Sequence, residues 1–117
     1  MLKVVELFAG VGTQRMALKR LGIEHDVAAI SEIDPYAINS YKAIHGDTLN
    51  LGDISKIDPQ DVPDCDLITY SFPCVSVSIS GKKDGLAEGS GTTSSLLWYC
   101  RDIIEHKKPK YLLMENV

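Results

Sequence analysis

Cys74 is the side chain in this sequence that its neighbours best prepare to act as a nucleophile. It directly follows Pro73, at the end of the segment SFPC (residues 71–74), and an apolar run at residues 67–70 precedes that segment. Because proline fixes its own φ angle, the direction of the backbone at Cys74 is restricted. Thiolates are good nucleophiles when positive groups lie nearby. A free cysteine is also a common buried hydrophobe, so this motif alone leaves both interpretations open.

A glycine turn at residues 8–12 (FAGVG) is a second candidate site. It lies between an apolar run at residues 4–8 and a helical pattern at residues 13–21. Strand, glycine turn and helix open a nucleotide-binding unit, because glycine lets a ligand approach the backbone and the helix N-terminus offers free amides. The dinucleotide fingerprint requires a further glycine three residues after Gly12, where this chain has Arg15. A purely structural turn is the alternative.

Acidic residues follow two further apolar segments. Glu32 lies 20 residues beyond Gly12, close to the spacing expected for an acid that binds ribose hydroxyls. Asp53 lies in an extended segment, residues 49–54, where its carboxylate could accept a hydrogen bond from an adenine amino group. A solvated strand end and a turn residue are the respective alternatives for these two acids.

Apolar segments alternate with helical patterns along the whole chain. We expect helices at residues 13–21 and 35–45, and a third from Thr92 or Thr93 to the residue before Pro109. We expect strands at residues 4–8, 26–30, 49–54, 65–70 and 110–114. This alternation predicts an α/β fold with a parallel sheet of about five strands. Ligands bind at the carboxyl ends of such strands, where the glycine turn, both acids, Cys74 and Glu115 would meet.

Composition limits the classes of protein to consider. The chain has 117 residues, of which 44% are hydrophobic and 24% charged, as expected of one globular domain. It has no apolar run of the ~20 residues that a membrane span needs, and no signal-peptide pattern at its N-terminus. Three irregularly spaced cysteines indicate a cytoplasmic protein without a disulfide framework. The histidines have no metal-ligand spacing, so we expect no metal. The net charge of −4 is unfavourable for binding phosphates.

The motifs, in this order, resemble those of the cytosine-5 DNA methyltransferases over the whole chain. The catalytic motif of that family is similar to FPC (residues 72–74), and the motif that follows it is similar to ENV (residues 115–117). The first motif is similar to FAGVG, the second to Glu32 with Asp34, the third to GDI (residues 52–54), and an intervening helix motif to residues 91–98. The resemblance implies a Rossmann-like, S-adenosylmethionine-dependent methyltransferase fold.

The resemblance also implies roles for individual residues. Cys74 would add to carbon 6 of cytosine, and Glu115 would hold a proton on ring nitrogen 3. Pro73 and Asn116 would support that site. The cofactor would be S-adenosyl-L-methionine, with S-adenosyl-L-homocysteine as product. The methionine and adenine side of the cofactor would contact the glycine turn at Phe8, Ala9, Gly10 and Gly12. Its ribose would bind Glu32. Its adenine would also contact Ile33, Asp53 and Ile54.

The implied partner is double-stranded DNA with a flipped cytosine, in the setting of restriction and modification. Family members continue beyond ENV with further motifs and a target-recognition domain. We therefore expect residues 1–117 to be the N-terminal portion of the cofactor-binding and catalytic domain, without the target-recognition region and inactive alone. We expect a complementary C-terminal chain as a partner, and we expect this chain to self-associate. The chain departs from common family residues at Thr13, Ser71, Val75, Val77 and Thr93.

Three alternatives stay open. The chain could be a catalytically dead cofactor-binding remnant that serves as an assembly module, or a fragment of a tRNA cytosine-5 methyltransferase, which shares these motifs. From the fold alone, a nicotinamide-dependent dehydrogenase is also possible, but it leaves Cys74 and Glu115 without a function.

Overall fold

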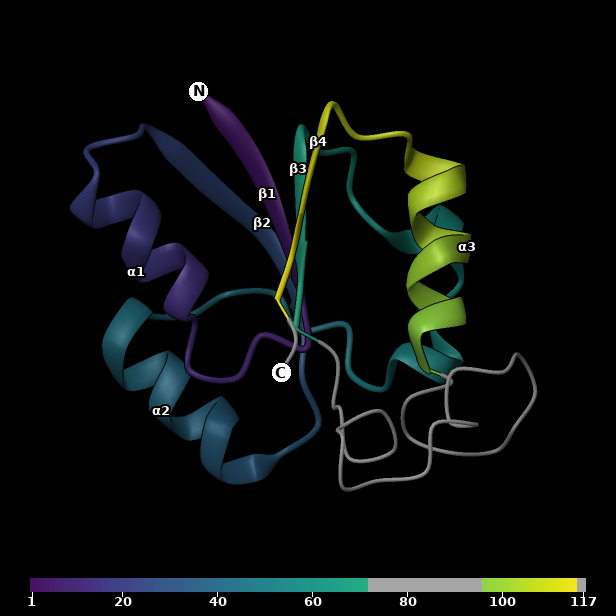
Figure 1. Ribbon diagram of the computed structural model, residues 1–117. Helices are drawn as coiled ribbons and strands as arrows, with labels where there is room; N and C mark the ends of the chain where they lie inside the picture. Colours follow the sequence, from purple (N-terminus) through teal and green to yellow (C-terminus); the bar gives the residue numbers. More distant parts are fainter. Residues whose placement is uncertain (72–95, 116–117) are drawn as a thin grey trace, which may run out of the picture.

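The computed structural model describes residues 1–71 and 96–115, and they form an α/β structure around a parallel sheet (Figure 1). Within these described residues the sheet has four strands in the order β2-β1-β3-β4, and every neighbouring pair is parallel. The strands are β1 (Leu2–Leu7), β2 (His25–Ser31), β3 (Leu67–Tyr70) and β4 (Tyr111–Met114). The predicted α/β class and parallel sheet are therefore confirmed.

Helices cover both faces of this sheet. Helices α1 (Thr13–Arg20) and α2 (Pro35–His45) lie on one face, and α3 (Leu97–Lys107) lies on the other (Figure 1). Two short 3-10 helices, η1 (Ile54–Lys56) and η2 (Pro59–Asp61), pack on the α3 side. Asp34 caps α2, accepting a hydrogen bond from the Tyr36 amide at 3.0 Å. The predicted start of the third helix lies outside the described residues.

The alternation of side chains along the central strand β1 divides the core in two. Val5 and Leu7 point to the α3 side, where they pack with Ile68, Cys100 and Ile103 among others. Val4 belongs to the second cluster, on the α1 and α2 side, with Ile30 and Tyr41. Because successive strand residues face opposite sides, Glu6 shares the face of Val4, and its side chain is fully buried there.

The expectation of a strand at residues 49–54, and hence of about five strands, is wrong for the described residues. The segment makes one isolated parallel bridge, between Ile30 and Asn50. The chain then turns at Gly52, whose φ is +82°, and Asp53 caps η1. Its carboxylate accepts hydrogen bonds from the Ser55 amide at 2.9 Å and hydroxyl at 2.7 Å. This local capping competes with strand pairing and ends it after one bridge.

Among the described residues, no helix is long and apolar enough to cross a membrane.

Candidate functional site

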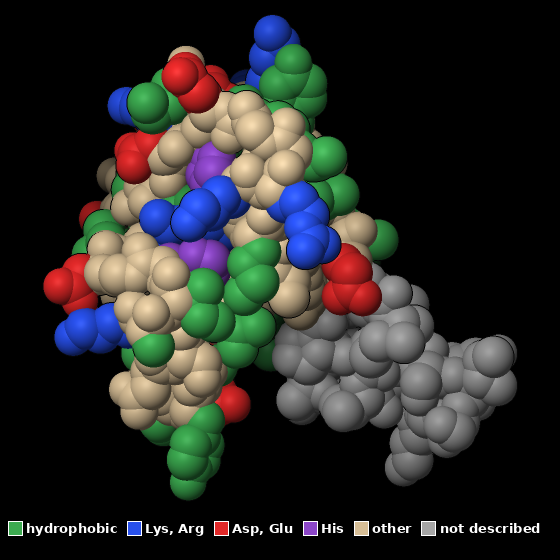
Figure 2. Space-filling model, turned by 90° about the vertical axis from the view of Figure 1, so that its left-hand side faces the viewer, with side chains coloured by type: hydrophobic (Ala, Val, Ile, Leu, Met, Phe, Trp, Pro, Cys, Tyr) green, Lys and Arg blue, Asp and Glu red, His purple; other side chains and the backbone are tan. Residues whose placement is uncertain are grey.

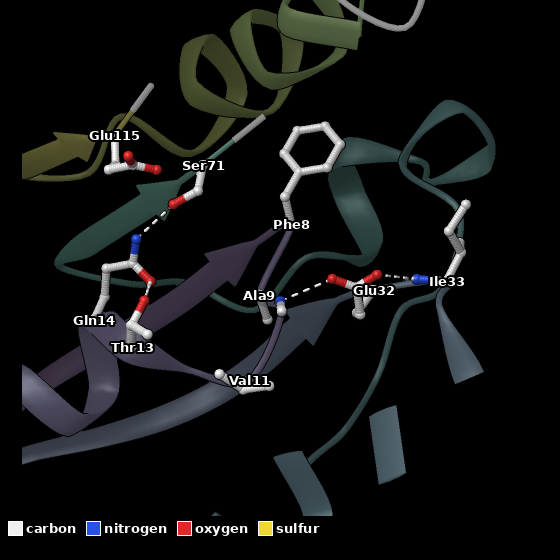
Figure 3. A pocket seen from close by; sticks show the side chains of 10 residues that line it. Phe8, Ala9, Val11, Thr13, Gln14, Glu32, Ile33, Ser71 and Glu115 are labelled. Atoms are coloured by element: carbon white, nitrogen blue, oxygen red, sulfur yellow. Dashed lines mark hydrogen bonds between the residues drawn. The ribbon is translucent and has the colours of Figure 1, made fainter. Parts of the chain in front are cut away.

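A concave pocket lies at the carboxyl ends of the strands, where the sequence predicts a site. Its volume is about 440 Å³, within the range of small-molecule sites. Figure 3 shows Glu32 and Ile33 on one side of it and Gln14, Ser71 and Glu115 on the other. The lining residues are Phe8, Ala9, Gly10, Val11, Thr13, Gln14, Glu32, Ile33, Ser71 and Glu115.

Glu32 fixes one wall of the pocket through its carboxylate. One oxygen accepts a hydrogen bond from the Gly10 amide at 2.8 Å (Figure 3). The other accepts from the amides of Ile33 and Asp34, each at 2.9 Å. Because a carboxylate offers about four acceptor positions, these three bonds leave room for one more donor. Glu32 therefore joins the glycine turn to the end of β2 and can still accept a bond from a ligand hydroxyl.

Asn50 positions Glu32 in turn, a role that the sequence does not predict. Its side-chain oxygen accepts from the Glu32 amide at 3.1 Å, and its side-chain nitrogen donates to the Glu32 carbonyl at 3.0 Å. The same oxygen accepts from the Gly52 amide at 3.0 Å. The single bridge at Ile30 brings Asn50 beside the end of β2. No motif in the sequence signals this contact, because it depends on the bridge.

The opposite wall joins the start of α1 to the ends of β3 and β4. The Gln14 side-chain nitrogen donates to the Ser71 hydroxyl (Figure 3). The Glu115 amide donates to the Tyr70 carbonyl at 3.1 Å, which continues the pairing of Tyr70 with Met114 by one residue. Glu115 is thus beside Ser71, the residue that opens the SFPC motif.

The structure gathers six of the predicted site residues into this pocket: Phe8, Ala9, Gly10, Glu32, Ile33 and Glu115. Gly12, Asp53 and Ile54 are not among the lining residues. Gly12 precedes α1 and packs toward α2, Ile54 lies in the core, and Asp53 caps η1. Hydrogen bonds from Ser55 hold the pKa of Asp53 below its usual value. Pro73, Cys74 and Asn116 lie outside the described residues.

The two described cysteines are poor candidates for nucleophiles. Burial raises the pKa of Cys65 to about 11 and that of Cys100 to about 12. Cys100 lies on α3 and is fully buried in the core. Both thiols therefore stay protonated at neutral pH. The described residues contain no group of three or more His, Cys, Asp or Glu that could hold a metal ion.

The charge of the pocket restricts what it can bind. Two carboxylates, Glu32 and Glu115, line it, and no Lys or Arg is among the described lining residues. Such a wall disfavours phosphate groups and suits a ligand that carries positive charge and hydroxyl donors. Phe8, Val11 and Ile33 add apolar surface. A sulfonium nucleoside fits these groups better than a dinucleotide with a pyrophosphate.

A parallel α/β sheet with a glycine turn and an acid at adjacent strand ends defines a nucleoside-cofactor-binding domain. The sequence model of the C-5 cytosine-specific DNA methylase family matches residues 2–117. The chain therefore belongs to this family, as its motifs indicate.

Individual relatives agree with this assignment. Type II methyltransferase M2.ScrFI of Lactococcus lactis subsp. cremoris is 39% identical over 100% of this chain and 47% of its own length. Orphan methyltransferase M.Rho11sI of Bacillus phage rho11s is 42% identical over 99% of this chain and 23% of its own length. The crystal structure of S. pombe Dnmt2 methyltransferase superposes with a TM-score of 0.74 and 29% identity over 100% of this chain.

The chain spans less than half the length of each of these relatives, and only 34% of the S. pombe structure.

Proposed function

We propose that this chain is the cofactor-binding and nucleophile-bearing N-terminal portion of a DNA (cytosine-5-)-methyltransferase. The observation that carries the proposal is the pocket, in which the glycine turn, Glu32 and Glu115 meet at one edge of the sheet. The match of the family to residues 2–117 supports the same activity. Residues 1–117 would be one part of the catalytic domain, and the target-recognition region would come from elsewhere.

The cofactor we assign to the pocket is S-adenosyl-L-methionine. Glu32 would accept a hydrogen bond from its ribose, using the acceptor position that the three backbone amides leave open. Phe8 and Ile33 would contact its apolar parts, and the amides of the glycine turn its polar ends. Asp53 and Ile54 remain predicted adenine contacts, and Gly12 a predicted contact of the turn. When bound, S-adenosylmethionine supplies an electrophilic methyl group.

The chemistry on the target base would fall to Cys74 and Glu115. The Cys74 thiolate would add to carbon 6 of cytosine, which makes carbon 5 nucleophilic. Glu115 would hold a proton on ring nitrogen 3, so that the ring does not accumulate negative charge during the addition. Glu115 lines the pocket beside Ser71.

The substrate would be double-stranded DNA, from which the target cytosine is flipped into the site. A net charge of −4 gives this chain little attraction for phosphates, so a second portion would supply most of the DNA contacts. That portion could be a complementary C-terminal chain. Strand β4 offers it a docking edge, because its four residues, Tyr111 to Met114, are about half exposed. We place the assembled enzyme in the cytoplasm.

Methyl transfer from radiolabelled S-adenosylmethionine tests this proposal. The purified chain is assayed alone and with a C-terminal portion from a relative such as M2.ScrFI, on duplex DNA and on tRNA. We expect negligible transfer by the chain alone and transfer to DNA when both portions are present. Cys74→Ala should abolish that transfer, whereas Cys65→Ala, a matched loss of a thiol, should retain it.

Three other outcomes of this assay would each contradict part of the proposal. Robust methylation by the chain alone would refute its dependence on a second portion. Transfer to tRNA only would favour the RNA substrate. Cofactor binding without transfer, with every C-terminal portion tried, would favour a cofactor-binding assembly module.

A further inference from the structure

A buried polar cluster lies behind the glycine turn and outside the pocket lining. It consists of Glu6 on β1, Arg15 on α1 and Tyr41 on α2, and we name it the Tyr41 cluster. The Tyr41 hydroxyl donates to Glu6 Oε1 at 2.5 Å and accepts from Arg15 Nη1 at 3.1 Å. Glu6 is fully buried and Tyr41 is 2% exposed. One hydroxyl therefore joins three elements that converge on the turn.

Glu6 has few other partners for its carboxyl group. Its second oxygen, Oε2, is buried without a hydrogen-bond partner in the described part of the chain. Burial raises the pKa of Glu6, whereas the hydrogen bond from Tyr41 and the charge of Arg15 lower it. An unpaired buried carboxyl is costly, so the bond from Tyr41 is the main contact that keeps this group in place.

The same cluster also holds the start of α1. Gly12, the residue before the helix, offers no side-chain cap, and the first turn of α1 contains no acidic residue. Arg15, in that first turn, donates from its side chain to the Tyr41 hydroxyl, which in turn donates to Glu6 on β1. The start of α1, and with it the pocket residues Thr13 and Gln14, is thereby tied to β1 through Tyr41.

Helix α2 also contacts the turn directly. A Cβ added at Gly12 would lie 2.7 Å from Tyr41 Cε2 and 2.5 Å from His45 Nε2. His45 Nε2 lies 3.1 Å from the Val11 carbonyl oxygen, and its ring centroid is 4.6 Å from that of Tyr41. Side chains of Lys, Arg and His gather on this side of the molecule (Figure 2). The turn is thus supported on the side away from the pocket.

We propose that Tyr41, acting with Glu6 and Arg15, is a positioning residue that holds the glycine turn in its ligand-binding shape. The inference rests on the proposed function for the identity of the ligand, S-adenosylmethionine or its product. None of the three residues lines the pocket. Their effect on the ligand would pass through the backbone of residues 8–14, which Glu32 holds from the opposite side through the Gly10 amide.

The test compares Tyr41→Phe with Tyr36→Phe in the 117-residue chain. Both changes remove one phenolic hydroxyl from α2, but Tyr36 is 84% exposed. The readouts are calorimetric titration with S-adenosylhomocysteine and hydrogen exchange of the ligand-free chain. We expect Tyr41→Phe to weaken binding about tenfold and to accelerate exchange at residues 8–14 about tenfold, more than in strands β1 and β3. Tyr36→Phe should change neither.

Arg15→Met is the second variant, in case Tyr41→Phe does not fold. Arg15 is only partly buried, and methionine keeps its apolar stem while removing the donors to Tyr41 and Thr48. We expect the same local acceleration of exchange, to a smaller extent.

Uniform acceleration over the whole chain, or unchanged exchange at residues 8–14, would overturn the inference, because both indicate a merely structural cluster. Unchanged affinity in a Tyr41→Phe chain that exchanges locally would overturn it as well. A wild-type chain that binds no S-adenosylhomocysteine would count against the proposed function, and exchange at residues 8–14 would still decide whether Tyr41 positions the turn.

Discussion

Glu32 is the residue on which the shape of the pocket depends most directly. Its carboxylate accepts hydrogen bonds from three backbone amides, two just after β2 and one in the glycine turn. Charge-assisted bonds of this kind are stronger than those between neutral groups. One side chain thus both joins two strand ends and offers a remaining acceptor position to a ligand.

Glu32→Gln should therefore reduce stability and ligand affinity together. Glutamine offers one acceptor oxygen, and its NH2 group would face a backbone N–H. We expect the free energy of unfolding to fall by about 1–3 kcal/mol and the Kd for S-adenosylhomocysteine to rise at least about tenfold. Urea denaturation and calorimetry measure the two effects. Glu24→Gln, at an exposed position, is the control, and equal behaviour of the two variants would contradict this role of Glu32.

Gly12 is required for a different reason. Its φ of +80° favours glycine, and an added Cβ would clash with Tyr41 and His45. Gly22 has a similar φ of +72°, but no atom of the described residues lies within 4 Å of such a Cβ. Gly12→Ala should therefore cost about 1–3 kcal/mol more unfolding free energy than Gly22→Ala, since only the former overpacks. Thermal or urea unfolding of the pair measures this difference, and equal losses would refute the contact with α2.

The sequence predicts some of these residues and not others, for a physical reason. Glu32 is predictable because a fixed spacing separates it from the glycine turn within one βαβ unit. Glu6 is embedded in an apolar strand pattern, and its partner Tyr41 is 35 residues away. Asn50 reaches Glu32 only through an isolated bridge. Contacts of this kind depend on tertiary packing, which leaves no local pattern.

Strand β4 differs from the other strands in the exposure of its side chains. All four of its residues are about half exposed, whereas most of β1 is buried. In the described part of the chain, β4 pairs with β3 alone. An exposed apolar edge strand invites pairing with another strand. The secondary-structure pattern predicts β4 correctly within a residue, but it cannot show which of its sides is covered.

We expect the chain to self-associate through β4 as its concentration rises. Leu113→Lys should shift it toward the monomer, because a charge on an edge strand opposes pairing. Light scattering over a concentration series measures the change in mass. Ile23→Lys, which places the same charge at an exposed apolar residue before β2, should not alter association. A wild-type chain that stays monomeric at all concentrations would contradict the expectation.

The molecule as a whole carries a net charge of −4 and covers less than half of its relatives' length. The order of motifs predicts the family and the fold, because each motif is a short local pattern within residues 1–117. DNA binding draws on positive charge that contacts phosphates, and this chain has 12 Lys and Arg against 16 Asp and Glu. We expect the isolated chain to bind a DNA duplex more weakly than about 10⁻⁴ M at physiological salt, near the non-specific limit. Fluorescence anisotropy checks this, and micromolar binding would contradict it.

The most direct test of the proposed cofactor site is an NMR titration of the isotope-labelled chain with S-adenosylhomocysteine. We expect saturable shifts of backbone amides in the glycine turn, at Glu32 and Ile33, and beside Glu115. Shifts that cluster around the shallow hollow at Met1, Lys19 and Gly22, or no saturable shifts at all, would contradict it.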